Sequence, residues 1–377
     1  MSDLNIEMVT DKASLKRFIR SPDALYKNDP NYINPLMIER MEAFSKDKNP
    51  YFEHAKGEYW IAVKGGKDVG RISAQIDDLA QEKWGPNLGH FGCFEADCEE
   101  TAFALFDTAS SWLKGHGMTR VQGPWSLSAN QEAGMLIDGF DTPPYVMMPH
   151  GKPEYDGWAK SYGFEKAKDL FAYERPTNTD IPSTFLRLSK MAERSKKAHL
   201  RTINMKKFDE DLEVILDIFN EAWSDNWGYV PLTKAEGAHT AASLKPIVKP
   251  HRTFIYEYEG EPVAFVVVIP DINDYIADLD GKLFPFGIFK LLWRIKFGKE
   301  KRHRTPLMGM RKKMQKSPLG AAMLFNMFYQ CILNIRERGC EHSESSWILE
   351  DNEGMNSILV GSGATIYKTY RIYEKTL

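Results

Sequence analysis

The chain has 377 residues, which suits two or three domains, and its 43% hydrophobic and 27% charged residues are typical of a folded globular protein. A formal net charge of −3 argues against a nucleic-acid binder that works through overall charge. The four cysteines show no zinc spacing, the N-terminus has no apolar signal region, and no apolar run reaches about 18 residues. These features predict a cytoplasmic protein with a sizeable core, no membrane span, no metal and no nucleic-acid partner.

The first half of the chain reads as an alternation of strands and helices. A β-hairpin is expected where two apolar runs flank Gly65 and Gly66. Apolar residues spaced three and four apart predict an amphipathic helix over residues 99–113, ending near Gly117. The other expected elements are strands at 6–9, 90–94, 120–125 and 165–174 and a helix at 155–162.

The second half repeats this order after a polar, proline-bearing stretch (residues 175–182) that reads as a linker. A helix over 212–223 and a long helix over 319–338 that stops at Gly339 follow from their apolar spacing and end signals. The expected strands are 200–205, the hairpin 253–258 and 262–269, 304–311, the strand that ends at 347–352, and 364–374, with a short helix before the last.

Matching residues in the two halves indicate a tandem duplication. Trp125 lies eight positions after Gly117, and Trp347 lies eight positions after Gly339. When Gly163 is aligned with Gly363, three further pairs coincide: Lys168 and Lys368, Tyr173 and Tyr373, Glu174 and Glu374. We therefore expect two α/β domains, 1–177 and 178–377. Two unrelated α/β halves are the alternative.

The loop before the long helix resembles the pyrophosphate loop of the Gcn5-related N-acyltransferases (GNATs), whose pattern is Arg/Gln-x-x-Gly-x-Gly/Ala. Gln315 and Gly320 match this pattern, while Pro318 departs from it and removes one backbone donor. Downstream, the family spacing falls on Asn352, Met355, Leu359 and Gly363, with Leu359 in place of a Tyr that serves many members as general acid.

The resemblance implies an α/β (α+β) fold of two tandem GNAT-like domains, each a mixed, mostly antiparallel sheet flanked by helices. It also implies acyl-CoA as co-substrate, because a helix N-terminus offers unpaired N–H groups and positive charge to a pyrophosphate. In the first half, four acidic residues within 94–100 occupy the place of the loop, so only the second half is expected to bind acyl-CoA. The residues expected to bind it are Met308, Met310, Gln315, Lys316, Ser317, Leu319, Gly320, Ala321 and Asn352.

Loops of unusual composition are candidates for the acceptor side of the site. Residues 123–134 and 139–150 carry Asn130 and Asp141, and a contact between domains is the alternative for both loops. Trp223, Asn226 and Trp227 follow the helix at 212–223 and are expected to bind substrate in the second half.

N-acyl transfer needs a base that makes the amine neutral, and a carboxylate often serves. Glu350 follows the strand at the edge where α/β sheets bind ligands, and Tyr367 lies on the final strand, so these two are the catalytic candidates. Glu344 lies further back on the same strand as Glu350. Each of these residues also has a purely structural alternative, and His150 and His342 are weaker candidates.

Large apolar residues at 283–297 run into a basic cluster that extends to Arg304. This combination suits a surface that contacts a bilayer or an acyl chain, and a helix packed on the sheet is the alternative. Peripheral membrane contact through residues 283–304, at the inner face of the membrane, is therefore one expectation.

The whole chain resembles a tandem GNAT group that includes the bacterial ceramide synthases. The resemblance rests on the Gly-Pro-Trp-Ser run at 123–126, the Asn-Trp-Gly turn at 226–228 and the Trp-Ile-Leu-Glu-Asp-Asn strand at 347–352. It implies transfer of a fatty acyl group to a sphingoid-type amine. The alternatives are a peptidoglycan-bridge-type aminoacyltransferase and a non-catalytic protein that binds acyl-CoA or lipid.

Overall fold

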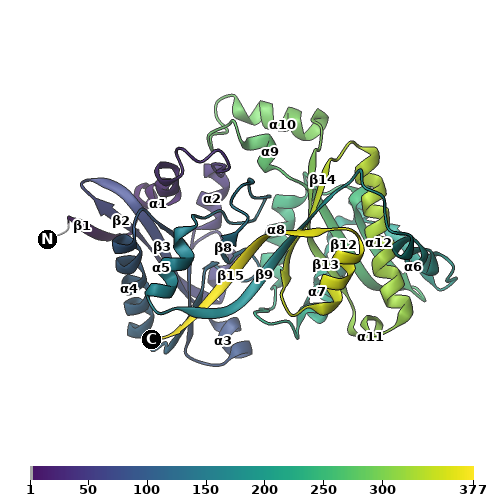
Figure 1. Cartoon of the computed structure of the whole chain (residues 1–377), viewed down its shortest axis with the longest axis horizontal. Helices are drawn as coiled ribbons and strands as arrows, with labels where there is room; N and C mark the ends of the chain where they lie inside the picture. The colour runs from purple at the N-terminus through teal and green to yellow at the C-terminus, as the bar shows by residue number, and fades with distance from the viewer. Residues whose placement is uncertain (1–2) are drawn as a thin grey trace. The chain divides into compact units, whose positions relative to one another are not determined.

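A computed structural model describes residues 3–377, and the chain forms two compact units (Figure 1). Unit 1 comprises Met1–Leu170, Tyr275–Leu291 and Lys368–Leu377, and unit 2 comprises Phe171–Asp274 and Leu292–Tyr367. The chain therefore returns to unit 1 twice. The division of the chain into two domains at residue 177, which was expected from the duplication, stays a prediction. The predicted fold class is confirmed, because helices flank mixed, mostly antiparallel sheets.

In unit 1 the paired strands follow the order β1-β2-β3-β4-β5-β15, in which only the β4–β5 pair is parallel. Near the C-terminus, β15 also pairs with β8, and β6 and β7 form a separate small ribbon. The strands are β1 (Leu4–Met8), β2 (Ala55–Lys64), β3 (Lys67–Asp77), β4 (Leu88–Ala96), β5 (Arg120–Gly123), β6 (Trp125–Ser126), β7 (Glu132–Ala133), β8 (Met135–Asp138) and β15 (Thr365–Thr376).

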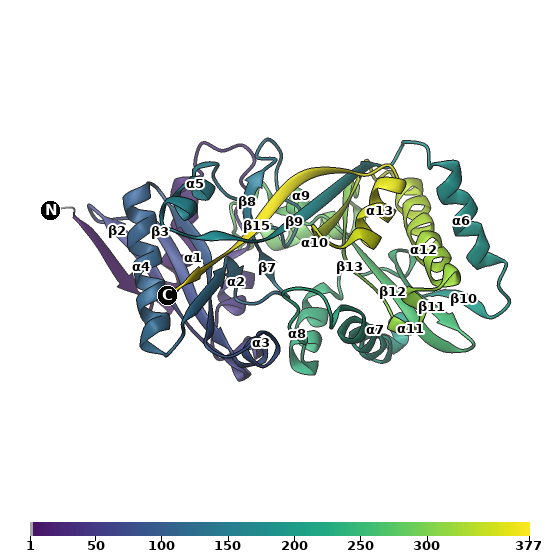
Figure 2. The same cartoon turned by 60° about the horizontal axis from the view of Figure 1, so that its bottom comes forward.

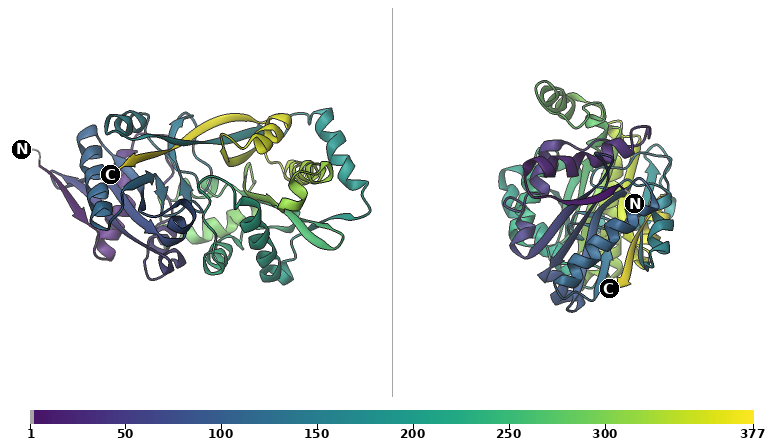
Figure 3. Two further views of the ribbon diagram at one scale, coloured as in Figure 1. Left: turned by 90° about the horizontal axis from the view of Figure 1, so that it is seen from below. Right: turned by 90° about the vertical axis from the view of Figure 1, so that its left-hand side faces the viewer.

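Helices cover both faces of this sheet. Alternate residues of β2 point to opposite faces. Trp60 and Ala62 join the core under α4, and Tyr59 and Ile61 join the core under α1. The blue helix α4 lies along the strands in the right-hand view of Figure 3. The helices are α1 (Lys12–Leu25), α2 (Met37–Ala43), η1 (Pro50–Glu53), α3 (Asp78–Trp84), α4 (Glu99–Gly115) and α5 (Glu154–Ser161).

In unit 2 the paired strands follow the order β14-β13-β12-β11-β10, in which only the β13–β14 pair is parallel. The end of β9 runs beside β14. The strands are β9 (Glu165–Pro176), β10 (Ala198–Thr202), β11 (Thr253–Tyr258), β12 (Glu261–Pro270), β13 (Arg302–Met310) and β14 (His342–Leu349).

The long helix α12 fills one face of this sheet, and α6 lies beside it (Figure 2). Met323, Met327 and Cys331 of α12 are buried in the core formed with β11 and β12. α12 is long and apolar enough to cross a membrane, but half of it is buried here, so it is a core helix. The helices are α6 (Ser183–Glu193), η2 (Met205–Lys207), α7 (Phe208–Trp223), α8 (Lys234–Leu244), η3 (Pro250–Arg252), α11 (Lys312–Gln315), α12 (Pro318–Glu337) and α13 (Glu353–Gly361). Two more, α9 (Asn273–Ile276) and α10 (Gly287–Phe297), lie where the chain passes between units.

The linker predicted at 175–182 is wrong. β9 continues to Pro176, and Arg175 is buried, with Nε donating to the Ser362 carbonyl at 2.7 Å. The amide of Thr177 donates to the Glu341 carbonyl at 2.9 Å. Polar residues that look like a linker in the sequence therefore fix the segment to unit 2. Helices α6 and α8 were not among the elements expected from the sequence.

Candidate active site

The parallel ladder between β13 and β14 ends part-way along both strands. It pairs Arg302 with His342 and ends at Thr305 with Ser345. Pro306, which follows, has no N–H to donate. Both strands continue, β13 to Met310 and β14 to Leu349. Where two strands stop pairing in this way, their main-chain groups can bind an extended ligand through hydrogen bonds.

The predicted pyrophosphate loop forms a short helix, α11, and the capped start of α12. Ser317 is the N-cap of α12, and its Oγ accepts from the Gly320 amide at 2.9 Å. Pro318 occupies the first helical position, where its missing N–H costs no helix bond. Lys316 is exposed beside this N-terminus. A 20-residue helix with a cation at its start fits an anionic group such as a pyrophosphate.

Two residues of this loop also have structural reasons to be present. A Cβ at Gly320 would lie 2.0 Å from the Met314 carbonyl oxygen, so any larger residue collides with the main chain of α11. The side-chain amide of Gln315 donates from Nε2 to the Met310 carbonyl at 2.8 Å and ties α11 to the end of β13. The predicted contacts of Gln315 and Gly320 with acyl-CoA stay predictions, as do those of Leu319 and Ala321 in the first turn of α12.

The segment after β14 places three more predicted residues. Asn352 is the N-cap of α13, and its side chain accepts from the Met355 amide at 3.1 Å. Glu350 is half-buried directly after β14. Leu359, at the position of the usual Tyr, is buried among Tyr173, Phe328 and other apolar residues. Its side chain is therefore part of the core.

Glu344, placed behind Glu350 in the sequence analysis, has the surroundings of a catalytic base. It is fully buried on β14, and burial raises its pKa to about 7 although the nearby Arg304 opposes the shift. Arg304 Nε lies 3.4 Å from Oε2, and Tyr367 OH lies 3.4 Å from Oε1. Oε2 makes no hydrogen bond to any residue that the structure describes. The structure thus brings Tyr367 to Glu344, next to the end of the β13–β14 ladder.

The signal for Glu344 was present in the sequence. It is a carboxylate inside a strand, with an arginine at the paired position of the neighbouring strand. A buried charge on a core strand needs either a partner or a function.

Trp223, at the end of α7, lies at the ends of β13 and β14. Its Nε1 donates to the Met308 carbonyl at 3.2 Å, and its ring centroid is 5.8 Å from that of Trp347. Asn226 and Trp227 follow in the next turn. The structure therefore joins a predicted acceptor-side residue, Trp223, to a predicted donor-side residue, Met308.

The other acceptor-side candidates lie in unit 1. The backbone N–H of Asn130 donates to Ser128 Oγ at 3.2 Å in the turn between β6 and β7. Asp141 is exposed in the loop after β8. The buried ammonium of Lys368 holds this loop by donating to the carbonyls of Gly139 and, at 2.7 Å, Thr142. Asn130 and Asp141 stay predictions.

The corresponding strands of unit 1, β4 and β5, are closely packed. Its parallel ladder ends at His90 with Gln122, yet every residue of β4 is buried. A Cβ at Gly92 would lie 1.9 Å from the Trp125 carbonyl oxygen, so main chain comes directly against β4 there. Close packing of this kind leaves no room for a ligand along β4.

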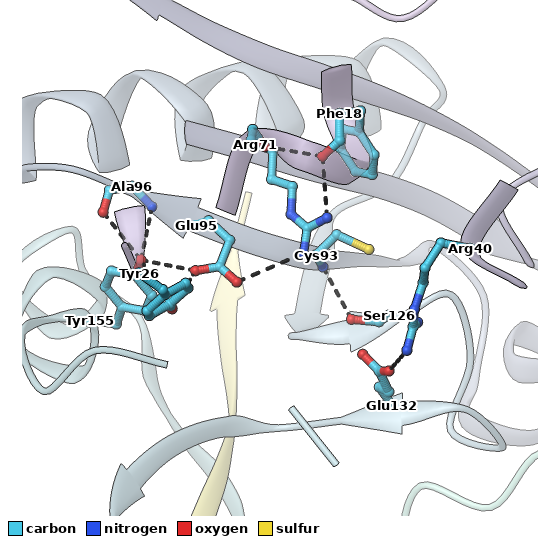
Figure 4. A network of polar contacts seen from close by, with 11 residues as sticks. Phe18, Tyr26, Arg40, Arg71, Cys93, Glu95, Ala96, Ser126, Glu132 and Tyr155 are labelled. Carbon is cyan, nitrogen blue, oxygen red and sulfur yellow. Dashed lines mark hydrogen bonds and ion pairs between the residues drawn. The ribbon is translucent and has the colours of Figure 1, made fainter. Parts of the chain in front are cut away.

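The idea that residues 94–100 repel a pyrophosphate needs correction for Glu95, which is buried (Figure 4). Its Oε2 accepts from Tyr26 OH at 2.5 Å and Tyr155 OH at 3.0 Å, and Arg71 Nη2 lies 3.8 Å from Oε1. Burial raises the pKa of Glu95. That unit 1 binds no acyl-CoA stays a prediction.

The two weak histidine candidates both have carboxylate partners. His150 Nε2 lies 2.8 Å from Asp29 Oδ2, and burial lowers the pKa of His150. His342 Nδ1 lies 3.3 Å from Glu174. Both contacts fit structural roles.

Two proteins of similar sequence match this chain over nearly its whole length. Protein YghO of Escherichia coli (strain K12) is 44% identical over 368 residues, which cover 97% of this chain and 94% of that protein. The bacterial ceramide synthase of Caulobacter vibrioides (strain NA1000 / CB15N) is 43% identical over 379 residues, which cover 100% and 98%. No protein-family model matches the sequence.

Solved structures share the fold at low sequence identity. A tandem GNAT protein from the clavulanic acid biosynthesis pathway aligns with a TM-score of 0.59 at 11% identity, over 99% of this chain and 98% of the other. A GCN5-related N-acetyltransferase from Sphaerobacter thermophilus aligns with a TM-score of 0.53 at 10% identity, over 99% and 96%. At these identities the likeness shows the fold alone.

Proposed function

Because the chain belongs to the tandem GNAT family that includes the bacterial ceramide synthase of Caulobacter vibrioides and protein YghO, we propose that it is an acyl-CoA-dependent N-acyltransferase acting on a long-chain amine. The observation that carries this proposal is the 43% identity to the ceramide synthase over the whole chain. The proposed reaction transfers a fatty acyl group to an amine of the sphingoid type.

In this proposal, unit 2 binds the acyl donor. The start of α12 and the exposed Lys316 hold the pyrophosphate, since N–H groups and a cation there favour an anion. The edges of β13 and β14 beyond Thr305 and Ser345 hold the extended arm of CoA. Met308 and Trp223 then lie beside the thioester.

The proposed chemistry needs one proton acceptor. The amine nitrogen attacks the thioester carbonyl, a C–N bond forms, the C–S bond breaks, and CoA leaves as its thiolate. The amine loses a proton, and Glu344 is the acceptor that we favour because its pKa is raised to about 7. Tyr367, 3.4 Å from that carboxylate, is placed to protonate the thiolate and then to take back the proton that Glu344 received from the amine. Glu350, directly after β14, is the second proposed base.

A non-catalytic acyl-CoA-binding protein is the second candidate. Pro318 in the loop and the buried Leu359 depart from the pattern of active family members. In our proposal Tyr367 supplies the hydroxyl that Leu359 lacks. Both proposed functions include binding of acyl-CoA, so only a turnover assay distinguishes them.

The test uses purified protein with palmitoyl-CoA and either sphinganine or ethanolamine, with products identified by mass spectrometry. We expect the sphinganine amide to form at least about tenfold faster than the ethanolamine amide, because burial of a long chain favours the lipid-like acceptor. Preference for ethanolamine would refute the long-chain acceptor. Bound acyl-CoA with neither product would show a non-catalytic protein.

A further inference from the structure

Helix α10, labelled in Figure 1, and the loop before it hold most of the large apolar side chains that the described chain exposes. Phe286 is 78% exposed, Phe289 70% and Trp293 62%. Phe284, Leu292 and Phe297 are also exposed. We call these six residues the α10 patch. The other exposed large apolar residues are spread over different elements: Met8, Ile38, Met191, Val360 and Ile366.

The helix is apolar on two faces. Leu291 is buried, and Ile288 and Ile295, three and four residues away, are partly buried, so one face packs against the protein. Phe289, Trp293 and Phe297 recur every four residues on a second face and are exposed. The outer face of a surface helix is normally polar, and contiguous exposed apolar patches mark contact sites. The packed-helix alternative from the sequence therefore accounts for only one of the two faces.

The charge around the α10 patch is positive. Residues 282–301 contain six lysines and arginines and one acidic residue, Glu300. Lys296, Lys299 and Lys301 are exposed. Lys290 pairs with Asp278, and Lys282 with Asp280 at 3.0 Å, so part of this charge is compensated locally.

These features fit an anionic bilayer better than a protein partner. Aromatic side chains and long cationic ones are the combination that lies at a membrane interface, where lysine reaches toward anionic headgroups. Lysine is depleted in protein–protein interfaces. A second copy of the chain docked patch to patch would also bring like charges together.

We propose that the α10 patch binds peripherally to anionic membranes, with its aromatic side chains in the headgroup and upper acyl region. The proposal deepens the proposed function, since a long-chain amine resides in membranes, but vesicle binding tests it without any enzymatic turnover. Binding at the membrane would let the enzyme take its acceptor without release of a poorly soluble lipid into water.

The experiment is sedimentation of the full-length protein with sucrose-loaded vesicles of phosphatidylcholine, with and without about 30% phosphatidylglycerol. We expect binding to the anionic vesicles and weaker binding in 0.5 M salt, because salt screens the lysines. The double variant Phe289→Ser/Trp293→Ser should lower the partition coefficient by roughly 100-fold, since each aromatic residue contributes about tenfold. Ile38→Ser, which alters a residue of α2 that is 55% exposed, is the matched control and should bind like wild type.

Three results would overturn the proposal: no sedimentation of wild type with anionic vesicles, undiminished binding of the double variant, or equal loss in Ile38→Ser. A different outcome is that the wild-type protein binds no vesicles and forms a dimer in analytical ultracentrifugation, while the double variant is monomeric. That result would show that the α10 patch binds a second copy of the chain. If wild type binds vesicles but makes no amide from detergent-dispersed sphinganine, the proposed function fails and the membrane surface stands.

Discussion

Units 1 and 2 each contain a buried glutamate beside an arginine and a tyrosine hydroxyl, but the hydrogen bonds to the two carboxylates differ. Glu95 in unit 1 accepts two tyrosine hydroxyls on one oxygen, at 2.5 and 3.0 Å. Glu344 in unit 2 has Tyr367 OH and Arg304 Nε at 3.4 Å and Ser346 as a further side-chain partner, while its Oε2 makes no hydrogen bond within the described chain. Burial raises the pKa of both carboxyls.

The difference shows how one fold can serve two purposes. A buried carboxylate with well-made hydrogen bonds holds the structure together, as Glu95 joins α1 and α5 to β4. One whose Oε2 makes no hydrogen bond and whose pKa is raised to about 7 can take up a proton during a reaction. The strand edges differ in the same sense, because β4 is buried throughout whereas Pro306, Leu307, Met308, Trp347 and Ile348 are only partly buried.

Replacing the two glutamates in turn should give the largest effect. Glu344→Gln removes the proposed base and should lower kcat by about 10²–10⁴-fold with little change in acyl-CoA affinity. Glu95→Gln, its matched control, should keep kcat within about twofold, because it lies in the packed core of unit 1. Steady-state assays with palmitoyl-CoA and sphinganine, on variants first shown to be folded by circular dichroism, measure this.

Equal losses in the two variants would remove the distinction between the units. If Glu350→Gln, and not Glu344→Gln, lost activity, the base would be the residue predicted from the sequence.

A charge reversal at the start of α12 tests where the donor binds. Lys316→Glu should raise the Kd of palmitoyl-CoA by about tenfold, because it places a negative charge beside the pyrophosphate. Lys114→Glu, the same reversal in the last turn of α4 in unit 1, should leave the Kd unchanged. Gly320→Glu is a poorer test, since its side chain would collide with the Met314 carbonyl. Isothermal titration calorimetry decides the point, and an unchanged Kd in Lys316→Glu would contradict the assigned site.

The smallest effect is expected in the loops of unit 1. Asp141→Ala and Asn130→Ala should each raise the KM for sphinganine by about threefold to tenfold and leave the Kd of acyl-CoA near wild type, because their polar groups are proposed to bind the amine. Asp47→Ala, at another exposed aspartate of unit 1, should change neither quantity. Loss of acyl-CoA binding in a folded Asp141→Ala protein would show that unit 1 takes part in donor binding.

Much of the fold follows from local signals in the sequence. The apolar spacing of Leu105, Phe106 and Leu113 predicted α4, and these side chains are buried in the core of unit 1. Gly117 and Gly339 have positive φ values at the helix ends that they predicted. Arg175 and Thr177 were misread as part of a linker, because their hydrogen bonds reach residues more than 160 positions away.

The site was harder to predict than the fold. Gln315 precedes the long helix as expected, whereas Gly320 lies in its first turn, and its close contact with the Met314 carbonyl depends on how α11 folds back. In the sequence Glu344 lies behind Glu350 on the same strand, and its facing strand cannot be read from its position along the chain. Only the pairing of β13 with β14 brings Arg304 opposite Glu344 and places both beside the end of the ladder.

The pH dependence of kcat/KM tests the role of Glu344 most directly. A base must be deprotonated to act, so with its pKa raised to about 7 the rate should rise roughly tenfold per pH unit below pH 7 and bend near that value. Glu344→Gln should lose the bend together with most of the activity, while Glu95→Gln should keep it. An unchanged bend near pH 7 in Glu344→Gln would contradict the account.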